Sequence, residues 1–105
     1  MIAYEVTVEL EPGLVAAYER YMRETHIPAV LATGCFQAAV LSRSSPGRYR
    51  SSYIARTEDD LGRYLRTYTA AMRADFAAHF PAGVSLSREV WTEVERWEGA
   101  APPAS

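Results

Sequence analysis

The sequence predicts a single α+β domain whose strands and helices follow the order β-α-β-β-α-β. Apolar and polar residues alternate over residues 2–10, 35–43, 48–56 and 84–94, which is typical of half-buried strands. Apolar residues recur every three or four positions after Pro12 and again after Thr57, which is typical of amphipathic helices. The chain has 105 residues, 49% hydrophobic and 23% charged, so it has the composition of one globular domain.

The first helix is expected to begin at Pro12, where a missing N–H is harmless. Its apolar stripe contains Leu14, Ala17, Tyr18, Tyr21 and Met22. Pro28 should interrupt the helix, because the residue before a proline avoids the α region. One more turn is expected over residues 29–32, and Gly34 then ends the helix.

The second half of the chain starts with a predicted hairpin, since the turn sequence 44–47 joins two strands. Thr57 then caps a helix that runs to about His79, and the acids at 58–60 face its positive end. Arg63, Arg66 and Arg73 fall on its outer, solvated side. We expect residues 1–97 to form the domain and the small, proline-rich residues 98–105 to be a disordered tail.

Right-handed crossovers predict that the first and third strands lie side by side, and parallel, at the centre of a four-stranded antiparallel-type sheet. Both helices then cover one face, which defines a ferredoxin-like fold. The other face carries Glu5, Leu41, Arg50, Ile54, Glu89 and Trp91. One interpretation is a solvated face that carries ion pairs such as Glu5–Arg50. The other is a surface through which two copies form a dimeric α+β barrel. The homodimer is the preferred interpretation, because Trp, Ile and Leu rarely share a solvated face.

His26 is the sharpest candidate for chemistry. It shares a helix stripe with Tyr18 and Met22 and lies at the end of the first helix. There it could act as a general acid or base, or as a donor to a ligand. The alternative is a structural histidine that caps the last carbonyls before Pro28.

The seven tyrosines all fall on predicted inner strand faces or on the helix stripes that meet them. If their hydroxyls converge, they form an aromatic pocket suited to a flat, oxygenated ligand. The alternative places each hydroxyl in water at the edge of the core. Tyr53 is the candidate to act beside His26, and the others are candidate substrate-binding residues: Tyr4, Tyr18, Tyr21, Tyr49, Tyr64 and Tyr68.

Composition and motifs disfavour several functions. The net charge of −2 gives no reason to expect nucleic acid, and no apolar run approaches the roughly 18 residues of a membrane span. Cys35 is the only cysteine, and there is no CxxC, HxxxH or HExxH motif, so neither a metal nor another cofactor is expected. The sequence therefore predicts a soluble cytoplasmic protein.

The stretch His26-Ile27-Pro28-Ala29-Val30-Leu31-Ala32-Thr33-Gly34-Cys35-Phe36 resembles the HIPxxLATGxF signature of an uncharacterised bacterial family of unknown function. The similarity extends over residues 1–97, although Tyr21 stands where that family usually has Trp. The resemblance implies a dimeric α+β barrel. That superfamily includes cofactor-independent monooxygenases, muconolactone-type isomerases, haem-handling enzymes and binding modules, so it fixes no catalytic residue.

Three functions follow as hypotheses. The first is a cofactor-independent enzyme that oxygenates, isomerises or cyclises a hydrophobic or aromatic metabolite, with His26 transferring protons. The second is a binding module that uses the same pocket without catalysis. The third is a dimeric interaction subunit whose core is packed and has no pocket.

Overall fold

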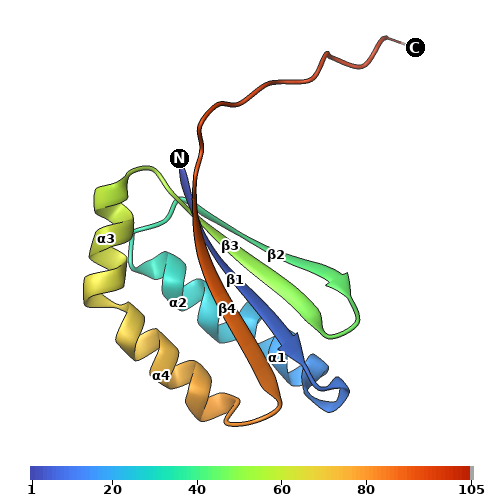
Figure 1. Cartoon of the computed structure of the whole chain (residues 1–105), viewed down its shortest axis with the longest axis vertical. Helices are drawn as coiled ribbons and strands as arrows, with labels where there is room; N and C mark the ends of the chain where they lie inside the picture. The colour runs from blue at the N-terminus through green and yellow to red at the C-terminus, as the bar shows by residue number, and fades with distance from the viewer. Residues whose placement is uncertain (105) are drawn as a thin grey trace.

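Four strands form one antiparallel sheet in the computed structural model, which describes residues 1–104 (Figure 1). They are β1 (Ile2–Leu10), β2 (Ala38–Ser45), β3 (Arg48–Ala55) and β4 (Val84–Thr92), in the spatial order β2-β3-β1-β4. Helical segments connect β1 to β2 and β3 to β4, and they pack on one face of the sheet. The predicted ferredoxin-like fold is confirmed.

The central strands β1 and β3 are neighbours as expected, but they are antiparallel. Ile2 pairs with Ala55 and Glu9 with Arg48, so the two strands run in opposite directions. The expectation that they are parallel was wrong. The first helical connection brings β2 back in the direction of β1, and the hairpin turn then reverses the chain into β3.

The first helical connection is continuous from residue 12 to residue 32. It consists of a 3₁₀ turn (Pro12–Leu14), α1 (Val15–Tyr21), a π-helical turn (Met22–His26) and α2 (Ile27–Ala32). The predicted interruption of the helix at Pro28 does not occur. In an α-helix the proline ring would clash with the carbonyl four residues earlier, and the wider π turn relieves this conflict. Ile27 N–H accordingly donates to Met22 O, five residues back.

The second helical connection is divided into α3 (Glu58–Thr67) and α4 (Thr69–His79), where a single helix was expected. Thr57 caps α3 as predicted, because its Oγ1 accepts a 3.1 Å hydrogen bond from Asp60 N–H. The division falls at Tyr68, whose φ of −115° departs from helical geometry. Thr67, Tyr68 and Thr69 are all weak helix formers, and two of them are β-branched.

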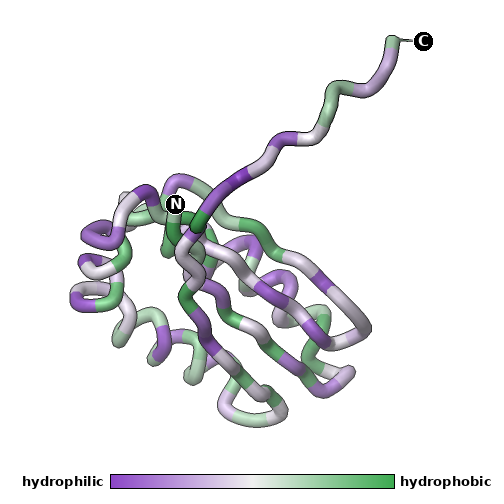
Figure 2. The backbone as a smooth tube through the Cα atoms, turned by 45° about the horizontal axis from the view of Figure 1, so that its top comes forward, coloured by the Kyte–Doolittle hydropathy of each residue, from purple (hydrophilic) through white to green (hydrophobic). Residues whose placement is uncertain are grey.

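The core lies between the sheet and the helices in two adjoining clusters. One contains Tyr4, Tyr53 and Tyr64, and the other contains Tyr18 and Tyr49. Hydrophilic and hydrophobic segments alternate along the strands, as the tube in Figure 2 shows. The helices cover only the apolar face of the sheet, and the second face has no covering layer among the described residues.

Strand β2 has the opposite facing from the one predicted. Leu41, expected on the open face, packs against the core clusters, whereas Val40 is 53% exposed. Residues 35–37 precede the strand, and Phe36 is buried while Ala38 lies beside Ile54 on the open side. The alternation therefore slips by one residue at Gln37, and such a slip moves every later side chain to the other face.

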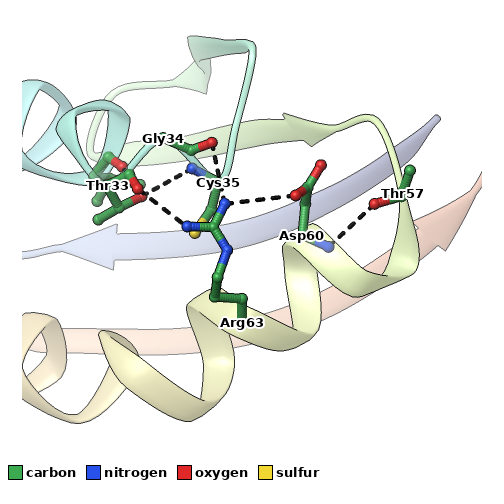
Figure 3. A network of polar contacts seen from close by, with 7 residues as sticks. Thr33, Gly34, Cys35, Thr57, Asp60 and Arg63 are labelled. Carbon is green, nitrogen blue, oxygen red and sulfur yellow. Dashed lines mark hydrogen bonds and ion pairs between the residues drawn. The ribbon is translucent and has the colours of Figure 1, made fainter.

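A small polar network fastens the end of α2 to the start of α3 (Figure 3). Arg63 Nη2 lies 3.4 Å from Gly34 O and 3.5 Å from Asp60 Oδ1. Gly34 has a φ of +76°, which is the left-handed geometry of a helix-ending glycine. Arg63 therefore has structural partners in addition to solvent.

Residues 93–104 contain no helix or strand and extend away from the domain (Figure 1). Val94 is 97% exposed and Trp97 is 77% exposed. The predicted disorder of 98–105 stays a prediction, and Ser105 lies outside the described residues. None of the helices in residues 1–104 has both the length and the apolar character needed to cross a membrane.

Candidate ligand-binding cavity

A cavity of about 40 Å³ lies between the sheet and the helices. Strands β1, β3 and β4 contribute to one side, and α1, the π turn, α3 and α4 contribute to the other. Its apolar wall includes Val6, Met72, Phe76 and Leu86. The volume has room for about three water molecules, so the core is not packed solid.

Four of the predicted tyrosines line this cavity: Tyr4, Tyr18, Tyr53 and Tyr64. The other three do not. The hydroxyls of Tyr21 and Tyr49 donate hydrogen bonds to Asp75 and Glu19, respectively. Tyr68 stacks on Tyr64 with ring centroids 6.3 Å apart. The structure therefore divides the aromatic set into cavity-lining residues and residues with separate structural contacts.

Three buried hydroxyl groups around the cavity have no hydrogen-bond partner within the described residues. They belong to Tyr18, Tyr53 and Thr69, and all three residues line the cavity. Buried polar groups are normally satisfied, and an unsatisfied one costs about 1–3 kcal/mol. The cavity is therefore a place where water or a ligand oxygen would be stabilised.

His26 also lines the cavity, because the π turn carries it to the inner side of the first helical connection. Its Nδ1 lies 3.5 Å from Tyr21 Oη, and the two rings stack with centroids 5.6 Å apart. This contact joins residues five apart, which the π turn brings onto one face. Nδ1 therefore faces a tyrosine hydroxyl, whereas the structural alternative required a backbone carbonyl.

Asp75 on α4 completes this arrangement. Tyr21 Oη donates a 2.6 Å hydrogen bond to Asp75 Oδ2, and the imidazole of His79 lies against the Tyr21 ring at a centroid distance of 4.4 Å. Burial lowers the pKa of His26, and the negative charge of Asp75 opposes that shift. The imidazole is therefore biased toward its neutral form, in which one ring nitrogen can accept a proton.

Three of the cavity tyrosines, Tyr18, Tyr53 and Tyr64, remain protonated at neutral pH. Burial raises the pKa of Tyr53 to about 12, and it also raises the pKa of Tyr18 and of Tyr64. Each of these hydroxyls can therefore donate a hydrogen bond at any physiological pH.

Two arginines missed as site residues, Arg73 and Arg88, line the cavity as well. Arg73 is exposed, as expected for the outer side of its helix, but it also lines the cavity, because the division at Tyr68 changes the phase of α4 relative to α3. Neither arginine has an ion-pair partner within residues 1–104. Arg88 had a signal in the sequence, since it interrupts the apolar inner face of the last strand.

The open face carries five of the six residues predicted for it: Glu5, Arg50, Ile54, Glu89 and Trp91. Arg50 Nη1 lies 3.8 Å from Glu5 Oε1, and Glu89 pairs directly opposite Glu5. Trp91 is 54% exposed and borders a groove shared with Ile54. Within residues 1–104 there is no group of three or more side chains placed to hold a metal ion.

The fold and the cavity define a small ferredoxin-like α+β protein with an aromatic interior. Within that class, the chain belongs to the family described as domain of unknown function DUF4286, whose model matches residues 1–94. This confirms the family resemblance of the HIPxxLATGxF segment. No curated protein matches the sequence significantly.

Solved structures with the same fold have more specific descriptions. A putative antibiotic biosynthesis monooxygenase from Deinococcus radiodurans has a TM-score of 0.71 at 13% identity, covering 96% of this chain and 100% of that one. The haem degrader MhuD of Mycobacterium tuberculosis, with two haems in its active site, has a TM-score of 0.68 at 13% identity, covering 93% and 100%. An ethyl tert-butyl ether D (EthD) family protein from Bacillus halodurans has a TM-score of 0.67 at 15% identity, covering 90% and 100%. At these identities the likeness establishes the fold alone.

The cavity does not fit a haem as it stands. Sites for drug-sized ligands usually enclose about 300–1,000 Å³, whereas this cavity encloses about 40 Å³. His26, the one histidine that lines it, directs Nδ1 at Tyr21. We derive no step through a haem.

Proposed function

We propose that the protein is a cofactor-independent enzyme that removes a proton from a small aromatic or hydrophobic ligand, with His26 as the base. The observation that supports this most directly is the convergence of His26 with the partnerless hydroxyls of Tyr18 and Tyr53 on one cavity. A base and two hydrogen-bond donors that line one cavity suit a reaction that develops negative charge on oxygen.

The proposed step acts on a C–H bond next to a carbonyl. His26 Nε2 takes the proton, the C–H electron pair forms a new C=C bond, and the carbonyl pair moves onto oxygen as an enolate. The hydroxyls of Tyr18 and Tyr53 donate to that oxygen. Return of the proton at another carbon gives isomerisation, which makes this step a common entry to several reactions.

The ligand body requires more room than the cavity offers, and the gap between α4 and β4 is the expected entrance. No residue of α4 is buried, and Leu86 of β4 is 39% exposed although it faces the helices. Few packed contacts are typical of elements that move when ligands enter.

The experiment is hydrogen–deuterium exchange of 2-tetralone in D2O, followed by NMR. The ketone has acidic hydrogens between its ring and carbonyl, so exchange reports proton removal without a complete reaction. The native protein should accelerate exchange over buffer, and His26→Gln should remove about 10²-fold or more of that acceleration. Glu24→Gln, an exposed change in the same π turn, is the matched control.

A non-catalytic binding module is the second candidate, supported by the same cavity. Line broadening or shifts of 2-tetralone signals without accelerated exchange would favour it over the enzyme. Absence of both binding and exchange would contradict both functions for this class of ligand.

We also propose that the protein forms a homodimer through the open face. Val40, Trp91 and the extended residues Val94 and Trp97 are largely exposed, and an interface on the open face would cover Val40 and Trp91. Light scattering after gel filtration should give twice the chain mass, and Trp91→Glu should give a monomer. A native monomer at micromolar concentration would contradict this proposal.

The buried free thiol of Cys35 suits the reducing cytoplasm, which we propose as the compartment.

A further inference from the structure

The polar lining of the cavity consists largely of hydrogen-bond donors. Tyr18, Tyr53 and Thr69 present partnerless hydroxyls, and Arg73 and Arg88 add guanidinium groups, which can only donate. Among the described residues, no aspartate or glutamate lines the cavity. The complement of such a lining is a group rich in acceptor oxygens.

We propose that the cavity selects ligands that carry a carboxylate or a comparable oxyanion. This inference rests on the proposed function, because it concerns the same cavity and specifies the class of ligand. A carboxylate presents two acceptor oxygens to the hydroxyl and guanidinium donors, and hydrogen bonds to an ionised acceptor are about twice as strong as neutral ones.

Arg88 carries this inference furthest, because its side chain, although exposed, interrupts the apolar inner stripe of β4 and lines the cavity. It lies opposite Val6 on the inner side of β4, where its neighbours along the strand on that side, Leu86 and Val90, are apolar. No acidic partner neutralises Arg88 within residues 1–104, so its full positive charge is available at the cavity. Arg73 approaches from α4, so the two positive charges border the cavity from different elements.

The size of the cavity agrees with an oxyanion head rather than a whole ligand. A volume of about 40 Å³ holds about three waters, which is comparable to the oxygens of one carboxylate and one bridging water. The apolar body of the ligand would then lie against Met72, Phe76 and Leu86 toward the gap between α4 and β4.

The nearby negative charge does not neutralise this site. Asp75 is the acidic residue whose charge acts on His26, and its carboxylate accepts the hydrogen bond of Tyr21 outside the cavity lining. The neutral bias of His26 also leaves the two guanidinium groups as the charges that line the cavity.

The test compares three bicyclic probes of similar shape by ligand-detected NMR titration at low salt. They are 2-naphthoate, the neutral 2-naphthamide and the cationic 2-naphthylmethylammonium. We expect the carboxylate to bind about tenfold or more tightly than the amide, and the cation to show no binding. Added NaCl should weaken binding of the carboxylate and leave the amide unchanged.

Arginine variants assign the charge preference to the cavity. Arg88→Gln and Arg73→Gln should each reduce the ratio of carboxylate to amide affinity toward one. Arg66→Gln is the matched control, because Arg66 is exposed as Arg73 and Arg88 are, but it lies on α3 and does not line the cavity. Circular dichroism establishes that each variant is folded, and Arg88→Lys should retain part of the preference.

Equal affinity for the carboxylate and the amide would overturn this inference while leaving the proposed function intact. Failure of all three probes to bind at millimolar concentration would contradict the cavity as a ligand site, and the proposed function with it. A carboxylate preference that Arg66→Gln abolishes and Arg88→Gln retains would also overturn the inference.

Discussion

The hydroxyl of Tyr21 donates a 2.6 Å hydrogen bond to the carboxylate of Asp75, which lies 54 residues further along the chain. The bond joins the first helical connection to α4, so it closes the side of the cavity on which His26 lies. Since the single hydroxyl proton is used on Asp75, Tyr21 Oη can only accept from His26 Nδ1. The proton of neutral His26 should therefore reside on Nδ1, with Nε2 free to act as a base.

This tautomer can be measured without a substrate. Two-bond ¹H–¹⁵N NMR spectra should identify His26 as the Nδ1–H form, the minor form of histidine in water. Tyr21→Phe removes the acceptor and should return the ring toward the Nε2–H form. Asp75→Asn should lower the pKa of His26 further, because the negative charge that opposes the effect of burial is lost. An Nε2–H tautomer in the native protein would contradict this positioning role of Tyr21.

Acid should destabilise the protein partly through His26. Its pKa is lowered in the folded state, so below the unfolded value of 6.5 the unfolded chain binds more protons. The contribution of His26 to the free energy of unfolding is fully present above pH 6.5, and it is lost as the pH falls toward the pKa of the folded state. Urea unfolding at several pH values should show the decline, and His26→Gln should reduce its slope. If the free energy of unfolding of His26→Gln depended on pH as steeply as that of the native protein, the acid sensitivity would arise from other groups.

Replacement of Tyr53 by phenylalanine should separate stability from binding. The change removes a buried hydroxyl that has no partner, so the free energy of unfolding should rise by about 1 kcal/mol. The melting temperature of a domain this size would then increase by about 4–8 °C. Binding of 2-naphthoate should weaken at the same time. Tyr49→Phe is the control, because Tyr49 donates to Glu19 and its loss should destabilise the protein.

Alkaline pH gives an independent measurement on the same residue. The pKa of Tyr53 is raised to about 12 from 10.0, so the unfolded chain loses its proton first. Stability should fall as the pH rises from about 10 toward 12, and Tyr53→Phe should lessen that fall. An identical alkaline profile for the variant would contradict the buried environment of this hydroxyl.

The sequence predicted the order of elements because alternation and helical spacing are local signals. It placed Tyr4, Tyr18, Tyr53 and His26 on the inner side, and all four line the cavity. It failed where local signals lose phase. The single-residue slip at Gln37 turns Leu41 to the core side of the sheet, whereas the sequence placed it on the open face. The division at Tyr68 brings Arg73 to the cavity, which the helical spacing did not predict. Both errors arise because counting along a periodic segment assumes that the segment is unbroken.

Asp75 could not have been identified from the sequence. Its partner Tyr21 belongs to another helix, and nothing in the spacing of either residue indicates that they meet. The relation depends on how α4 packs against the first helical connection, which is a tertiary property. Arg88 differs, because a charge within an apolar inner stripe is visible in the sequence and marks a position worth testing.

The π turn at Met22–His26 makes the length of this segment a determinant of the helix that follows. It accommodates one residue more than an α-helical turn, and each α-helical residue corresponds to a rotation of about 100°. Deletion of Glu24 would therefore leave an ordinary α-helical turn, in which the fully buried Val30 keeps its facing but the ring of Pro28 meets the backbone carbonyl that the wider turn avoids. The segment should tolerate substitutions at its exposed positions far better than any change in its number of residues.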